Sequence, residues 1–114
     1  MAVPVSVIEF AAFRRSANEL LSADEQEALI NLIAYTPMVG DLIPDSGGLR
    51  KLRIGRNGIG KRGGARVIYY FHNTTIPVLL LALYAKNERV NLSANETREM
   101  RSLVEKVVTR WVKK

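Results

Sequence analysis

The first third of the chain has apolar residues at the three- and four-residue spacing of an α-helix. This spacing runs from Phe10 to Leu21 and predicts a helix there, after a short valine-rich edge strand from Val3 to Glu9. Ser22 and Glu25 have the spacing of a capping box, which predicts that a second helix begins there and ends before Pro37. The two helices should therefore form a hairpin joined around Ser22.

The middle of the chain is rich in β-branched and aromatic residues and is divided by glycines, as is typical of strands joined by loops. Strands are predicted at Leu49 to Ile54, Ala65 to Asn73 and Val78 to Lys86. Loops or turns are predicted at Val39 to Gly48, Gly55 to Gly64 and Asn73 to Pro77. Because the connections are short, the three strands should form an antiparallel meander. The last strand is apolar on both faces, which indicates a central strand covered on both sides.

A second capping box, Ser93 with Glu96, predicts the start of a last helix. Its apolar residues form one stripe: Met100, Leu103, Val104, Val107, Val108 and Trp111. The predicted order is β-α-α-β-β-β-α, an α+β fold whose helix hairpin covers one face of a small antiparallel sheet. The last helix should cover part of the other face or pack at the edge. With 114 residues and 47% hydrophobic content, one domain spanning residues 1–114 is expected.

Basic residues are concentrated in one stretch of the chain. Between Ser46 and Asn87 there is no Asp or Glu. Eight basic residues fall in this stretch: Arg50, Lys51, Arg53, Arg56, Lys61, Arg62, Arg66 and Lys86. The rest of the chain has more acidic than basic residues, so the stretch accounts for the whole net charge of +6. A charge block on predicted strands, and not in a tail, is typical of a surface that binds phosphate.

Two glycine motifs in this stretch have the letters of nucleotide-binding signatures without their context. Gly55 to Lys61 reads G-x-x-x-x-G-K, but Arg62 stands where a P-loop needs Ser or Thr, and a strand follows where a P-loop needs a helix. Gly58, Gly60 and Gly63 have the dinucleotide spacing outside any βαβ unit. The segment is therefore interpreted as a hairpin loop, either flexible or in contact with backbone phosphates.

Alternation along the strands places part of the basic set on common faces. Arg66 shares a face with Ile68 and Tyr70, and Lys51 shares one with Arg53. On the last strand Ala82, Tyr84 and Lys86 share a face. If these faces coincide, five cations converge on one phosphate: Lys51, Arg53, Lys61, Arg66 and Lys86. Like charges this close are costly unless an anion occupies the site. The alternative is a solvated basic face that only keeps the domain soluble.

Other candidate chemistry is sparse. His72 is the only histidine and is assigned to a strand end, and no residues have metal-ligand spacing, so no metal or other cofactor is expected. Met100 and Trp111 are expected as core contacts of the last helix. Three tyrosines near the basic strands either stack on bases or belong to the core: Tyr69, Tyr70 and Tyr84.

Cellular location is constrained by what the chain lacks. The sequence has no cysteine, which fits a reducing cytosol. The longest apolar run, Val78 to Ala85, is too short to span a bilayer. A cytoplasmic protein without membrane contact is therefore expected.

Several segments, in order, resemble a known family. They are Gly40-Asp-Leu-Ile-Pro44, Gly47-Gly-Leu-Arg-Lys-Leu-Arg53, Gly60-Lys-Arg-Gly-Gly-Ala-Arg66-Val-Ile-Tyr-Tyr-Phe71 and Leu83-Tyr-Ala-Lys-Asn-Glu88, followed by a helix start at Leu92-Ser93. Over about Pro37 to Glu96 the chain resembles the HigB branch of the RelE-type toxins. The resemblance implies a RelE-like fold and a type II toxin that enters the ribosomal A site and cleaves mRNA. It also implies a cognate antitoxin, expected to be a helix-turn-helix protein encoded next to the toxin.

The resemblance also implies roles for individual residues. The family's functional positions fall on Arg50, Lys51, Arg53, Lys61, Arg66, Tyr84 and Lys86. We expect catalysis from Arg53, Lys61, Arg66, Tyr84 and Lys86, and RNA binding from Arg50, Lys51, Arg56, Arg62 and Asn87. The implied reaction is metal-free transesterification, in which arginines stabilise the transition-state charge. Lys86 or Lys61 could act as base, because a lysine crowded by cations loses its proton more readily. Tyr84 or an arginine could assist the leaving group.

Two other functions fit the same residues. A non-catalytic basic nucleic-acid-binding module, of phage or regulatory origin, would bind with a steep salt dependence and would not cleave. A protein-interaction domain would present its basic face to an acidic partner, which an antitoxin would also satisfy.

Overall fold

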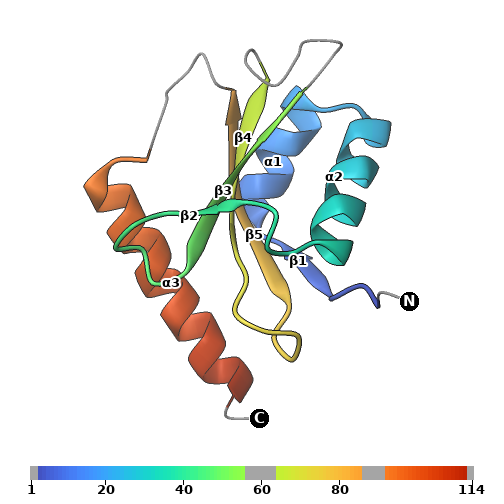
Figure 1. Cartoon of the computed structure of the whole chain (residues 1–114). Coiled ribbons are helices and arrows are strands. Elements are labelled where there is room, and N and C mark those ends of the chain that lie inside the picture. The colour runs from blue at the N-terminus through green and yellow to red at the C-terminus, as the bar shows by residue number, and fades with distance from the viewer. Residues whose placement is uncertain (1–2, 56–63, 86–91, 113–114) are drawn as a thin grey trace.

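The structure, a computed structural model, describes residues 3–55, 64–85 and 92–112. Within these residues three helices flank one five-stranded sheet (Figure 1). In chain order the elements are β1 (Val7–Glu9), α1 (Ala11–Leu20), α2 (Ala23–Tyr35), β2 (Asp41–Leu42), β3 (Leu49–Ile54), β4 (Ala65–Tyr70), β5 (Val78–Ala85) and α3 (Ala94–Val112). The predicted α+β class is confirmed, and the element order matches apart from the added strand β2.

The sheet is mixed, whereas an antiparallel sheet was predicted. Its strand order is β1-β5-β4-β3-β2, and β3, β4 and β5 form the expected meander. β1 takes the expected edge position but is parallel to β5, with Val7 opposite Val78. No hairpin joins these two strands, so no tight turn forces them to run in opposite directions.

Both predicted capping boxes are present. The Ser22 hydroxyl accepts from the Glu25 N–H at 3.1 Å, and the Glu25 carboxylate accepts from the Ser22 N–H at 2.8 Å. Ser93 and Glu96 make the same reciprocal pair at the start of α3. Each box satisfies two backbone donors that a helix start otherwise leaves open, which is why the sequence alone located these starts.

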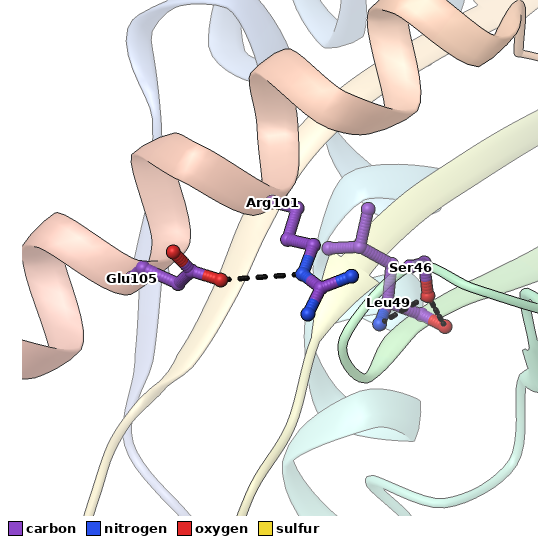
Figure 2. Close-up of polar contacts among 4 residues, drawn as sticks. All are labelled: Ser46, Leu49, Arg101 and Glu105. Carbon is purple, nitrogen blue, oxygen red and sulfur yellow. Dashed lines mark hydrogen bonds and ion pairs between the residues drawn. The ribbon is translucent and has the colours of Figure 1, made fainter.

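The predicted loop from Val39 to Gly48 contains β2 and a tight turn into β3. The buried Ser46 hydroxyl donates to the Ile43 carbonyl at 2.6 Å and accepts from the Leu49 N–H at 3.0 Å. Gly47 has a φ of +75° and touches α3, since a Cβ there would lie 2.9 Å from Arg101 Nε. Figure 2 shows Arg101 between this turn and Glu105, whose carboxylate is 3.2 Å from Arg101 Nε. The turn is thus anchored against α3.

The helix hairpin covers one face of the sheet, as predicted. Phe13, Ala17 and Ile33 are fully buried against strand residues that include Val67 and Leu80. These strand residues point to the same face because alternate residues of a strand share a side. This cluster is the larger part of the core.

The last helix packs on the other face, against Leu49, Tyr70, Leu79 and Leu81. Val104 is buried there, and Met100, Val107 and Val108 are partly buried. The prediction for Trp111 is wrong, because this side chain is 41% exposed. Leu103 on the same predicted stripe is 42% exposed. The stripe therefore packs on the sheet through Met100, Val104, Val107 and Val108, while Leu103 and Trp111 are exposed.

A register shift in the sheet sets which side chains of β5 share a face with those of β4. Tyr69 pairs with Leu80, but the preceding residue Ile68 pairs with Ala82, so Leu81 is an extra residue opposite the step. Such a bulge moves every following side chain of the strand to the other face. Without it Tyr84 would lie on the face covered by the helix hairpin.

Candidate nucleic-acid interface

Three strands bring functional side chains into one row across the sheet. Arg53 on β3 is opposite Arg66 on β4, and Arg66 is opposite Tyr84 on β5. Lys51 lies in the next row, opposite Ile68. The four side chains Lys51, Arg53, Arg66 and Tyr84 therefore share one face, which alternation within each strand had left open, and we call this group the cationic row.

The cationic row occupies the half of this face that α3 leaves uncovered. The other half carries Leu49, Tyr70, Leu79 and Leu81 and is packed under the helix. One strand face is thus divided into an apolar half that anchors α3 and a half that carries the cationic row, in which Arg53 is exposed while Arg66 and Tyr84 are only 4% and 3% exposed. The helix packs on the neighbouring half of the same face and the helix hairpin packs behind it, so the cationic row lies on a sheet that is held from both sides.

Two adjoining hollows lie over the cationic row. The larger, of about 450 Å³, is lined by Val39, Asp41, Lys51, Leu52, Arg53 and Arg66. The smaller, of about 200 Å³, is lined by Ile43, Pro44, Lys51, Arg66, Ile68, Tyr84, Leu92 and Thr97. Lys51 and Arg66 line both. The two hollows together give a groove, polar in its larger part and more apolar in its smaller part, that runs from the β2 edge of the sheet to the first turn of α3.

The members of the row differ in exposure. Arg66 is only 4% exposed, Lys51 is half-buried and Arg53 is exposed. The backbone N–H and C=O groups of Lys51 point toward β2, and those of Arg53 point the same way because alternate residues of a strand do so. Arg53 and Arg66 are therefore opposite each other without mutual backbone hydrogen bonds, and in such pairs the opposite side chains are closest. Two guanidinium groups in this position repel each other. An anion bound between them would remove that cost, and guanidinium groups bind phosphate through paired donors.

Asp41 is a functional neighbour that sequence reasoning missed. It lies in β2 opposite Lys51 and lines the larger hollow. Asp41 precedes the acid-free stretch in the sequence, but the pairing of β2 with β3 places it beside the basic residues of that stretch. In the sequence, Asp41 and Leu42 lie between turn residues, and a segment of this length is too short to predict a strand.

Arg50 lies on the opposite face from the cationic row. It pairs with Tyr69, and its Nη1 donates to the carbonyls of Gly40 at 2.7 Å and Met38 at 3.3 Å. The structure does not bring it together with Lys51, the other candidate RNA contact in the described part of the chain. It binds the backbone of the segment before β2, which forms one wall of the larger hollow.

Tyr69 completes this attachment. Its buried hydroxyl accepts from the Gly40 N–H at 2.8 Å and donates to the Pro37 carbonyl at 2.8 Å. Burial raises the pKa of Tyr69, while the Gly40 hydrogen bond and the positive charge of Arg50 partly oppose the rise. Of the two readings left open for Tyr69, the structure supports the core. We call Tyr69, Arg50 and Gly40 the clamp.

Five candidate residues fall outside the described residues: Arg56, Lys61, Arg62, Lys86 and Asn87. Among the described ones, His72 is exposed at the end of β4, with its ring stacked on Tyr70 at 6.3 Å between centroids. In the described part of the chain, no group of three or more His, Asp or Glu side chains could hold a metal ion. None of the helices described is long and apolar enough to cross a membrane.

Fold and site together define a small α+β protein that presents a cationic groove on the uncovered half of a sheet. The family model for the RelE toxin of the RelE/RelB toxin–antitoxin system matches residues 13–114. This match covers most of the chain and includes all but the first two residues of α1 and every later element. The chain therefore belongs to the RelE toxin family, and its role is that of the toxin of a toxin–antitoxin pair.

Proposed function

We propose that this toxin is an endoribonuclease of the HigB branch, which cuts mRNA in the A site of the ribosome. The observation that carries the proposal is the cationic row, Lys51, Arg53 and Arg66 beside Tyr84, on one face of the sheet and lining the groove. Membership of the RelE toxin family supports the same reading. The partner would be an antitoxin, proposed to be a helix-turn-helix protein encoded beside the toxin.

The reaction is a transesterification within the RNA. The 2′-oxygen attacks the adjacent phosphorus and the bond from phosphorus to the 5′-oxygen breaks, which yields a 2′,3′-cyclic phosphate and a free 5′-hydroxyl. Negative charge builds up on the phosphoryl oxygens in the transition state. Arg53 and Arg66 would stabilise this charge with fixed guanidinium donors, and Lys51 would hold the neighbouring backbone.

Two protons must move in this reaction. One leaves the attacking 2′-hydroxyl, for which Lys86 or Lys61 remains the proposed base. The other goes to the departing 5′-oxygen, and Tyr84 is the proposed donor because it lies next to Arg66 at the smaller hollow.

The test is cleavage of a translated mRNA in a reconstituted extract by wild type and by Arg66→Gln. Loss of one transition-state donor should slow cleavage by about 100-fold or more. Arg14→Gln is the matched control, because Arg14 is an exposed arginine on α1 and lies away from the groove. Both variants must bind the antitoxin and unfold cooperatively.

The chemistry of the new RNA ends tests the mechanism separately. Cyclic phosphate and 5′-hydroxyl ends support transesterification, and 3′-hydroxyl with 5′-phosphate ends contradict it. If Arg66→Gln cleaves at the wild-type rate, the assignment of the site is wrong. Salt-dependent RNA binding with no cleavage by wild type would leave the non-catalytic nucleic-acid-binding module as the better description.

A further inference from the structure

The carboxylate of Asp41 is exposed in the groove. Asp41 lies on β2 opposite Lys51, shares its face of the sheet and lines the larger hollow. Among the residues that the structure describes, none forms an ion pair or a hydrogen bond with this carboxylate. The Ile43 N–H donates to the Leu49 carbonyl at 2.8 Å, so by alternation Asp41 and Lys51 form a backbone-bonded pair, in which opposite side chains are farther apart. The carboxylate is therefore available to a ligand in the hollow.

The clamp fixes the backbone that carries this carboxylate. The Tyr69 hydroxyl accepts from the Gly40 N–H at 2.8 Å, and Arg50 Nη1 donates to the Gly40 carbonyl at 2.7 Å. A Cβ at residue 40 would lie 2.8 Å from the Tyr69 hydroxyl, so this close approach needs glycine. Gly40 lies between Val39 and Asp41, and both neighbours line the larger hollow. The cleavage chemistry proposed above uses neither Tyr69 nor Arg50, whereas a recognition group needs a fixed backbone of this kind.

Asp41 is too far from the proposed cleavage centre to move its protons. Neighbouring strands are about 4.8 Å apart, and β2 is separated from β4 by one strand and from β5 by two. The backbone of Asp41 is therefore roughly 10 Å from that of Arg66 and roughly 14 Å from that of Tyr84. An acid or a base must come within about 3 Å of the group whose proton it transfers. Asp41 thus faces the part of the RNA beside the phosphate held at Arg66.

A carboxylate at this place selects a nucleobase and not a phosphate. It repels phosphate, and it accepts hydrogen bonds but donates none. Among the four RNA bases, guanine alone presents two adjacent donors, N1–H and the N2 amino group, on its Watson–Crick edge. Adenine and cytosine present one amino group beside an acceptor nitrogen, and uracil presents one N–H between two carbonyls. The two oxygens of Asp41 therefore fit guanine best.

The hollow also has the size and the apolar wall that a base needs. Its volume of about 450 Å³ lies within the range of roughly 300–1,000 Å³ that is typical of ligand pockets. The Val39 side chain lines the hollow and is 42% exposed, so it offers an apolar contact to the flat face of a base. Because Val39 and Asp41 flank the clamped Gly40, the apolar wall and the carboxylate are held in one arrangement.

We propose that the larger hollow is a nucleobase subsite, in which Asp41 accepts hydrogen bonds from N1 and N2 of a guanine next to the cleaved phosphate. This assignment rests on the proposed function for its substrate, single-stranded RNA. Its consequence is sequence selectivity, because the toxin then cuts RNA beside guanine. Asp41 is a specificity-determining residue and takes no part in bond breaking.

The first experiment measures binding of the free chain to hexamers of uridine that carry one central guanosine, inosine or adenosine, by fluorescence anisotropy at low salt. Inosine lacks only the N2 amino group of guanosine. Wild type should bind the guanosine hexamer about tenfold more tightly than the inosine hexamer, which is the discrimination expected of a paired base contact. Equal affinities for these two hexamers would overturn the proposal.

Asp41→Asn gives a sharper readout, because a carboxamide pairs with adenine through one acceptor and one donor. This variant should bind the adenosine hexamer more tightly than the guanosine hexamer, which reverses the wild-type order. Asp45→Asn is the matched control: Asp45 is an exposed acid in the following turn that lines neither hollow, and its variant should keep the wild-type order. If Asp41→Asn tightens binding of all three hexamers equally, Asp41 acts only by repelling phosphate and the subsite is wrong.

The positions of cuts in a translated mRNA separate this proposal from the proposed function. Wild type should cut beside guanine, and Asp41→Asn should shift the cuts toward adenine. Loss of all cleavage in Asp41→Asn, with the wild-type order of hexamer affinities, would place Asp41 in proton transfer and overturn the subsite alone. Selective binding of the guanosine hexamer by a wild type that cuts no RNA would overturn the proposed function alone.

Discussion

The hydroxyl of Tyr69 is the most informative single atom to remove, because it links the core to the wall of the groove. Tyr69→Phe keeps the buried ring and deletes the two hydrogen bonds, each 2.8 Å long, to Gly40 and Pro37. The segment they hold leads into β2 and contributes Val39 to the larger hollow. The variant therefore tests whether the clamp stabilises the fold.

The expected magnitude follows from what the deletion leaves behind. Gly40 is buried, so its N–H loses its partner in a place with little access to water, at a cost of about 1–3 kcal/mol. The Pro37 carbonyl is half-buried and can accept from water, so it adds little. A loss of about 2 kcal/mol in the free energy of unfolding corresponds to a Tm lower by roughly 8 °C for a domain of this size.

The measurement is urea unfolding followed by far-ultraviolet circular dichroism. The midpoint should fall by about 1 M with an unchanged m-value. Tyr70→Phe is the matched control: it lies on the same strand, and in the described part of the chain no hydrogen bond of its hydroxyl is found. If Tyr69→Phe is no less stable than Tyr70→Phe, the clamp does not stabilise the fold and the reasoning fails.

Three further predictions concern the same region. Gly40→Ala would place a Cβ 2.8 Å from the Tyr69 hydroxyl and 2.9 Å from the Lys51 carbonyl, so urea unfolding should show a loss of about 1–3 kcal/mol; a neutral effect would contradict the close packing. Arg53→Met removes the repulsion with Arg66 and should stabilise the fold by about 0.5 kcal/mol. The same variant should bind RNA more weakly, and the slope of its log binding constant against log salt concentration should decrease by about one. Reduced stability of this variant would show that the two cations do not repel. Burial raises the pKa of Tyr69 above its unfolded value of 10.0, so above pH 10 the unfolded chain releases this proton first and the free energy of unfolding falls as pH rises. This fall should be shallower in Tyr69→Phe. Identical slopes of unfolding free energy against pH in the two proteins would refute the raised pKa of Tyr69.

Much of the fold could be predicted because its signals are local. The capping boxes at Ser22 and Ser93 are satisfied within four residues of chain, and the strand Leu49–Ile54 was predicted with its observed bounds. The predicted strand from Ala65 is shorter than expected and ends at Tyr70. Beyond it, the Asn73 carboxamide accepts from the N–H groups of Thr75 and Ile76 and forms a turn.

The candidate site was predictable in part. Alternation correctly grouped Arg66 with its own strand face and Lys51 with Arg53, because side-chain direction in a strand depends only on position. It could not assign Arg50, which shares the charge of its neighbours but points to the other face and binds backbone carbonyls. Charge counting also excluded Asp41, because pairing between β2 and β3 is invisible in a count along the chain.

The sequence by itself determined the class of fold, the helix starts and the concentration of positive charge, all of which depend on neighbours along the chain. The tertiary structure alone decided that Arg53, Arg66 and Tyr84 form one row. That row requires the bulge opposite Ile68, which turns Tyr84 toward Arg66, and it requires α3 to cover only the apolar half of the face. Both depend on how distant strands and a helix pack together, and the free energy of that packing is not encoded in any local pattern.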